Sequence, residues 1–226
     1  MRKGGVVTAG KRSSGPMKRS VALFSDCLFQ RSRMESTLID FDNTTPTLFL
    51  DFDGTLHRGR GLIDELTGGV SLDTGNPVLE FAPLLSELLA PYPAVEIVLT
   101  TSWLYTLSFE QVLSHLPPAL AKRVVGSTRS YKARFGYLRD GSARTYIIRS
   151  YVFDKRLKNW LALDDSVYGA HHLSTDFLPL EPHLVLLDAR QGIGSLKAQD
   201  RISRWLRTVH APKDEQLEKD GPSSGD

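Results

Sequence analysis

The feature that most constrains the fold is a short apolar run, residues 48–50, that ends in two carboxylates, Asp51 and Asp53. Because Pro46 and Gly54 bound this stretch, it is typical of a buried β-strand. Side chains alternate between the two faces of a strand, so the two aspartates would share one side if the strand continued. They would then lie at the carboxyl end of a strand, where open α/β sheets bind ligands. Two carboxylates held close repel each other, and a bound cation relieves that repulsion.

Length and composition allow one sizeable α/β domain. The chain has 226 residues, 41% of them hydrophobic and 24% charged, and its formal net charge of +2 does not by itself indicate nucleic-acid binding. The single cysteine, Cys27, excludes an intrachain disulfide and a cysteine-rich zinc site. No apolar run approaches the ~20 residues that a membrane helix needs. We therefore expect a cytoplasmic protein with no membrane partner.

A second, mostly apolar run, residues 95–99, ends in hydroxyl side chains, because Thr100, Thr101 and Ser102 follow it. The run predicts another buried strand. The hydroxyl of Thr101 and nearby backbone N–H groups could hold a phosphoryl oxygen. Alternatively, Thr100 or Ser102 caps the helix that follows.

A third apolar run, residues 160–163, ends in a second acidic pair, Asp164 and Asp165. Packing does not explain two adjacent carboxylates at a strand end, because burying a charge without a partner is costly. A helix precedes this run. We expect Ser142 to cap it, with Arg144 in its first turn.

Strands and helices alternate along the chain, which predicts an α/β fold, a Rossmann-like three-layer sandwich with a mostly parallel central sheet. Residues 57–77 are polar and rich in glycine, which predicts a loop or a small flap. Without a long helical insert, the cap is expected to be small or absent. The other expected elements are helices at 81–89 and about 103–115, a loop at 126–143, a strand at 183–188 and a last helix that carries Ile202, Trp205, Leu206 and Val209.

The ends of the chain differ in composition from its middle. We expect residues 1–45 to be a basic, disordered N-terminal arm, residues 46–210 to be the folded domain and residues 211–226 to be a disordered tail. The arm holds another Asp-x-Asp pattern, Asp40 and Asp42, but only two apolar residues precede it, so we assign the site to the later pair.

The stretch from Leu48 to Thr55 resembles the first motif of the haloacid dehalogenase-like (HAD) superfamily, whose members are mostly magnesium-dependent phosphatases. Thr101 resembles the second motif, and the pair Asp164 and Asp165 resembles the fourth. The third motif is a basic residue, usually Lys, near the start of a helix. Arg144 lies at such a position, although an arginine has a planar guanidinium group where a lysine has a compact ammonium group. Lys132, Lys155 and Lys158 are the alternative candidates.

The resemblance covers about residues 46–209, so the folded domain is expected to be HAD-like. The run 184–188, followed by a glycine-containing turn and a helix, resembles a bacterial subgroup whose relatives occur with RNA-repair proteins. This second resemblance is carried by fewer residues than the first.

The resemblance implies a mechanism. Asp51 would attack phosphorus and form an aspartyl-phosphate, while Asp53 would protonate the leaving oxygen and then activate water. Thr101, Ser102, Arg144 and Lys132 are the candidates for holding the phosphoryl group. The implied cofactor is Mg²⁺, with Asp51, Asp165 and the Asp53 backbone carbonyl as ligands and Asp164 as an outer or alternate ligand.

The implied substrate is a phosphorylated small molecule or a phosphorylated nucleic-acid end. One alternative is a catalytically inactive HAD-like binding module or a nucleic-acid-associated accessory protein. Another is a receiver-like phospho-switch, but there the acid pair precedes the phosphorylated aspartate, and the order here is the reverse. His171, His172 and Asp176 could suggest a transition-metal site. The other acids favour a hard cation, so we expect these histidines in a loop.

Overall fold

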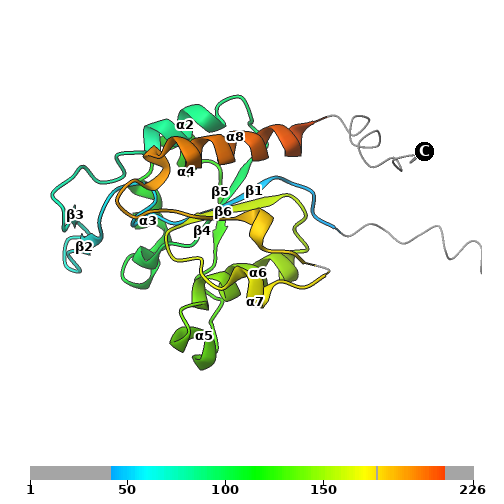
Figure 1. Ribbon diagram of the computed structural model, residues 1–226. Coiled ribbons are helices and arrows are strands. Elements are labelled where there is room, and N and C mark those ends of the chain that lie inside the picture. The colour runs from blue at the N-terminus through cyan, green and yellow to red at the C-terminus, as the bar shows by residue number, and fades with distance from the viewer. Residues whose placement is uncertain (1–41, 177, 212–226) are drawn as a thin grey trace, which may run out of the picture. The chain divides into compact units, whose positions relative to one another are not determined.

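In the computed structural model, a parallel five-stranded sheet forms the centre of the molecule (Figure 1). The structure describes residues 42–176 and 178–211. The predicted disordered arm, residues 1–45, and tail, residues 211–226, lie outside the described residues except at 42–45 and 211, and the rival Asp40 also lies outside them. The fold class is as predicted, a Rossmann-like α/β sandwich with a parallel sheet.

The strand order places β1 in the middle of the sheet. The strands are β1 (Thr47–Leu50), β4 (Glu96–Leu99), β5 (Val124–Ser127), β6 (Trp160–Asp164) and β7 (Leu184–Leu186), in the order β5-β4-β1-β6-β7. The chain therefore builds outward from β1 to β5 on one side and then returns to build β6 and β7 on the other. Such a reversal creates a crevice outside the carboxyl ends of the central strands, where ligands bind in open α/β sheets.

Alternating side chains on the buried strands form two cores, one on each face of the sheet. Leu48 and Leu50 of β1 face one core, and Phe49 faces the other. The first core is covered by α2 (Ala82–Leu89), α3 (Phe109–Ser114), α4 (Pro118–Ala121) and α8 (Leu196–His210), and the second by α6 (Ala143–Lys155) and α7 (Ala170–Leu173) (Figure 1). The sheet is thus covered on both faces, as parallel sheets are.

The segment between β1 and α2 is a small flap, as expected. It forms an antiparallel hairpin of β2 (Gly61–Ile63) and β3 (Val70–Leu72). A two-stranded hairpin has few partners of its own, so its stability depends on contacts with the domain.

Three local predictions were wrong in detail. The helix expected at 103–115 is broken into a 3₁₀ turn, η2 (Ser102–Tyr105), and α3, because Ser108 and Gln111 form a capping box that starts a new helix. A short helix, α5 (Phe135–Arg139), lies in the segment expected to be a loop. Ser142 precedes α6 but does not cap it, since its hydroxyl donates to Asp140.

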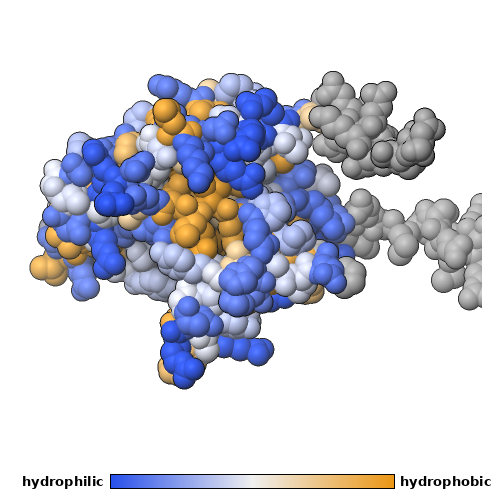
Figure 2. Space-filling view, in the orientation of Figure 1, coloured by the Kyte–Doolittle hydropathy of each residue, from blue (hydrophilic) through white to orange (hydrophobic). Residues whose placement is uncertain are grey.

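The C-terminal part follows the prediction more closely. Short 3₁₀ turns, η3 (Glu181–His183) and η4 (Gly192–Gly194), flank β7, and α8 buries Ile202, Trp205 and Leu206. His171 and His172 lie in α7 rather than in a loop. The edge strand β7 is only partly buried, and Figure 2 shows apolar surface between α8 and α6 on this side of the molecule. Among the described residues, no helix has the length and apolar character needed to cross a membrane.

Candidate active site

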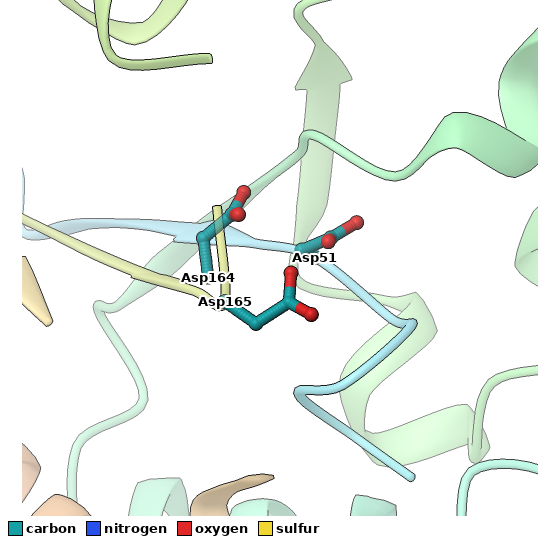
Figure 3. Close-up of side chains that lie close together, drawn as sticks. All are labelled: Asp51, Asp164 and Asp165. Atoms are coloured by element: carbon teal, nitrogen blue, oxygen red, sulfur yellow. The ribbon is translucent and has the colours of Figure 1, made fainter. Parts of the chain in front are cut away.

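The carboxyl ends of the central strands bring together side chains that are far apart in the sequence. Asp51 follows β1, Asp164 is the last residue of β6, and Asp165 follows it. Figure 3 shows the three aspartates at neighbouring strand ends, and one ligand oxygen of each lies within 4.8 Å of the others. Asp51 and the pair Asp164 and Asp165, which the sequence separates by more than a hundred residues, therefore form one cluster.

The cluster opens into a polar cavity of about 460 Å³. This acidic cavity is lined by Asp51, Asp53, Arg60, Ser102, Arg144, Asp165, Ser166 and Tyr168. Its volume is in the range of small-ligand sites, about 300–1,000 Å³. Carboxylates, hydroxyls and two arginines in one hollow suit an anionic group held beside a cation.

Asp51 is buried and incompletely paired. Its Oδ1 has no hydrogen-bond partner among the described residues, and its Oδ2 lies 3.7 Å from the Arg144 guanidinium. Burial, and then the nearby charge of Asp164, raise the pKa of Asp51 well above its usual value, although Arg144 opposes the shift. The free oxygen is thus a strong acceptor that the protein itself does not satisfy.

Arg144 is the basic residue that the fold places beside Asp51 and Asp164. It lies in the first turn of α6, and its Nε is 3.2 Å from Oδ2 of Asp164. Burial alone would lower the pKa of Arg144, but the charges of Asp51 and Asp164 outweigh it and raise that pKa. The guanidinium therefore stays charged beside the two carboxylates.

Asp164 and Asp165 are held differently. The backbone N–H of Ser166 donates to Oδ1 of the fully buried Asp164 at 2.8 Å, and the Thr100 hydroxyl donates to its Oδ2 at 3.4 Å. Asp165 is half-buried, and burial together with the charge of Asp164 raises its pKa. Gly54 has a positive φ of 64°, and a Cβ there would lie 2.3 Å from Oδ2 of Asp165, so only glycine lets this carboxylate approach the turn.

Three N–H donors converge on one oxygen of Asp53. Its Oδ1 accepts from the Gly61 backbone N–H at 2.9 Å, from Trp103 Nε1 at 3.0 Å and from His57 Nε2 at 3.0 Å. The Leu79 N–H donates to Nδ1 of His57, so the proton of this buried ring is on Nε2. Burial would raise the pKa of Asp53, but the bonds from His57, Gly61 and Trp103 outweigh it and lower that pKa.

These three donors leave the second oxygen of Asp53 available. Only the Ser102 hydroxyl approaches Oδ2 among the described hydrogen bonds, at 3.4 Å. His57 and Trp103 were not predicted from the sequence as site residues. Their only signal was proximity in sequence, since His57 comes four residues after Asp53 and Trp103 directly follows the hydroxyl run.

The other predicted residues take different positions. Thr101 is buried, and its hydroxyl accepts from the Trp103 N–H, so it caps η2 and does not line the acidic cavity. Lys132 is exposed and lies outside that cavity. Among the rivals, Lys155 pairs with Asp154 at 3.1 Å, and Lys158 pairs with Asp42 at 3.0 Å, away from the acidic cluster.

The residues of the cluster fit a magnesium ion. Asp51 Oδ1 is a buried acceptor that none of the described residues satisfies, and the three grouped ligand atoms are all carboxylate oxygens, the hard ligands that Mg²⁺ prefers. The side chain of Asp53 is not in this group. Its predicted contribution, through the backbone carbonyl, remains a prediction.

The comparison with protein families identifies the chain. A family described as the HAD domain in Swiss Army Knife RNA repair proteins matches residues 47–198, which is more than half of the sequence. The chain belongs to this family. The HAD-like character expected from the motifs is thereby confirmed, and it indicates a hydrolase, usually a phosphatase. The comparison with curated proteins found no match, and neither did the comparison with solved structures.

Proposed function

We propose that this HAD-like domain is a magnesium-dependent phosphatase that works through an aspartyl-phosphate on Asp51. The observation that carries the proposal is the pairing of two unlike carboxylates at one strand end. Asp51 offers a buried oxygen that has no hydrogen-bond partner in the described part of the chain, whereas Asp53, two residues later, is held through one oxygen with the other available. Enzymes that need both a nucleophile and an acid–base group use such differences in environment.

In the first step, an oxygen of Asp51 attacks phosphorus, and the bond between phosphorus and the leaving oxygen breaks. The leaving oxygen takes a proton from Oδ2 of Asp53. In the second step, water attacks the phosphoryl group and gives a proton to Asp53, and the bond between phosphorus and the Asp51 oxygen breaks, which releases phosphate, frees the Asp51 carboxylate and returns Asp53 to its protonated form.

Asp53 suits the second step in the free protein, because its lowered pKa keeps it ionised at neutral pH. The first step needs a protonated Asp53. A bound phosphate ester would raise the pKa of Asp53 and so favour its protonated form, since a nearby negative charge raises the pKa of a carboxyl group.

Arg144 holds and neutralises the phosphoryl oxygens, because its guanidinium lies beside Asp51 and lines the acidic cavity. Ser102, at the same cavity, is a further donor, and Thr101 acts through the backbone of η2. Asp51 and Asp165 would hold Mg²⁺, which would supply positive charge against the phosphoryl group and relieve the repulsion of the acids.

A phosphorylated nucleic-acid end is the substrate class that the family description supports best. The small β2–β3 hairpin leaves the site open to a polymer end. Arg60 at the rim adds positive charge for a polyanion.

The test is turnover of a substrate panel with Mg²⁺ and with a chelator. The panel contains acetyl phosphate, an alkyl phosphate and oligonucleotides that end in a 3′- or 5′-phosphate. We expect phosphate release only with Mg²⁺, and mass spectrometry of a quenched reaction should find the phosphoryl group on the peptide that contains Asp51. Metal-independent turnover, or a phosphoryl group on another residue, would contradict the proposal.

A further inference from the structure

A second cavity adjoins the acidic cavity and shares two of its residues. It measures about 260 Å³, and Arg144 and Ser166 line both cavities. Its other lining residues are Thr100, Thr101, Leu104, Tyr105, Thr128, Arg129, Leu138, Gly141, Ala143 and Ile147. Because small-ligand sites usually exceed about 300 Å³, this side cavity suits one part of a ligand whose remainder lies in the acidic cavity.

The path from the acid–base group to the side cavity runs along η2. Ser102 and Tyr105 are three residues apart in this 3₁₀ turn, so their side chains lie on the same side of it. Ser102 approaches Oδ2 of Asp53, and Tyr105 lines the side cavity. A leaving group that is protonated by Asp53 therefore passes Ser102 and reaches Tyr105.

The walls of the side cavity suit a flat ring. Tyr105 is 73% exposed and Leu138 is 62% exposed, although large apolar side chains are normally covered. Leu104 and Ile147 add aliphatic surface. The exposed Arg129 and the guanidinium of Arg144 lie at the same cavity, so an aromatic group that carries further negative charge would meet both a ring face and a cation.

We propose that this side cavity binds the nucleobase of the nucleotide that carries the scissile phosphate, stacked on Tyr105. A nucleobase is joined to its phosphate through a sugar, which lets the ring lie beyond Arg144 while the phosphate stays beside Asp51. Base stacking on an aromatic side chain tolerates every sequence, because each base has a π-face. This inference rests on the proposed function and adds the part of the substrate that the protein recognises.

Arg129 extends the inference to the source of the nucleotide. In an oligonucleotide, the next phosphodiester lies close to the terminal base, and Arg129 is an exposed cation at that cavity outside the acidic cavity. Free mononucleotides lack that phosphodiester. A difference between the two substrates that depends on Arg129 identifies the polymer end as the ligand.

The experiment compares short oligonucleotides whose phosphorylated terminal residue either carries a base or is abasic. We expect the wild-type protein to favour the base-bearing substrate in kcat/KM by about 5- to 100-fold, the range of one stacked base. The preference should vanish in Tyr105→Ala and persist in Tyr105→Phe, which keeps the ring. Phe153→Ala removes another exposed ring, which lines neither cavity, and should keep the preference.

Binding of the same two oligonucleotides to the Asp51→Asn protein, measured by calorimetry, gives a readout that needs no turnover. Equal affinity for both, or a preference that survives in Tyr105→Ala, would overturn the side cavity as a base site. Hydrolysis without base preference would overturn this inference and leave the phosphatase intact. Base-selective binding without hydrolysis of any substrate would support the base site and overturn the proposed phosphatase activity.

Arg129→Ala should weaken binding of the oligonucleotide more than that of the mononucleotide, and equal effects would assign the site to free nucleotides.

Discussion

Asp51 and Asp53 are separated by one residue, yet their surroundings are opposite. Asp51 is buried near Asp164, one of its oxygens has no hydrogen-bond partner within residues 42–176 and 178–211, and its pKa is raised. Asp53 is held by three N–H donors on one oxygen, and its pKa is lowered. Two side chains of the same chemical type therefore differ in their properties because their surroundings differ. The free oxygen of Asp51 favours a cation or phosphorus, and the fixed orientation of Asp53 favours proton transfer from Oδ2.

The largest expected effect comes from removing the nucleophile. Asp51→Asn keeps the shape of the side chain but cannot form the aspartyl-phosphate, so turnover should fall by roughly 10⁴-fold or more. The matched control is Asp42→Asn, in the other Asp-x-Asp pattern, which should retain activity since Asp42 pairs with Lys158. Kinetic measurements on acetyl phosphate check both variants. Loss of activity in Asp42→Asn but not in Asp51→Asn would assign the site to the earlier Asp-x-Asp pattern.

Asp53→Asn should lower kcat less, by about 10²- to 10⁴-fold, because it removes acid–base catalysis and keeps the nucleophile. The loss in formation of the aspartyl-phosphate should be greater for an alkyl phosphate than for acetyl phosphate, whose leaving group needs little protonation. Rapid-quench measurement of that step separates it from hydrolysis. Equal losses with both leaving groups would remove the acid role from Asp53.

Trp103→Phe tests whether the three donors orient Asp53. It removes one N–H and keeps most of the ring, so kcat on an alkyl phosphate should fall about tenfold, the scale of one hydrogen bond to a charged group. Trp205→Phe is the control, because Trp205 Nε1 has no hydrogen-bond partner among the described residues. Equal effects of both substitutions, or an effect of Trp103→Phe on KM alone, would argue for simple packing.

The smallest effects concern stability without metal. Asp51 and Asp165 have raised pKa values, so the folded state keeps protons that the unfolded state releases, and stability should fall as pH rises above the usual value of about 3.9. Asp53 has a lowered pKa, so its contribution is present above that value and is lost as pH falls through its folded pKa.

Asp165→Asn should therefore weaken Mg²⁺ binding and raise the thermal unfolding temperature of the metal-free protein by a few degrees, the scale of about 1 kcal/mol. Calorimetric titration and thermal melts at several pH values check the two effects. Unchanged magnesium affinity would separate Asp165 from the metal site, and a lower unfolding temperature would contradict the repulsion argument.

The sequence predicted the acidic cluster because its signals are local. An apolar run followed by aspartates marks a strand end, and a parallel sheet brings such ends together. The resemblance also selected Arg144, which the fold places against Asp51 and Asp164. The capping box of Ser108 and Gln111 was readable as well, and it would have divided the helix expected at 103–115.

The partners of Asp53 could not be predicted in this way. Trp103 and His57 reach the same oxygen only after the turn following β1 and the turn following β4 have packed against each other, and neither residue has a periodic pattern that signals this contact. The helix α5 was missed for a different reason. Its Phe135 and Leu138 are exposed, so they do not form the buried stripe by which a helix is recognised.

A hydrogen bond connects the β2–β3 hairpin to Asp53, the proposed acid–base group. Gly61, the first residue of β2, donates to Asp53, and a Cβ on it would lie 2.6 Å from the indole nitrogen of Trp103. Displacement of the hairpin by a bulky substrate would withdraw the Gly61 donor from Asp53, and the pKa of that carboxyl group would rise. Under the proposed mechanism, substrate size and the strength of the acid would then be coupled through the hairpin.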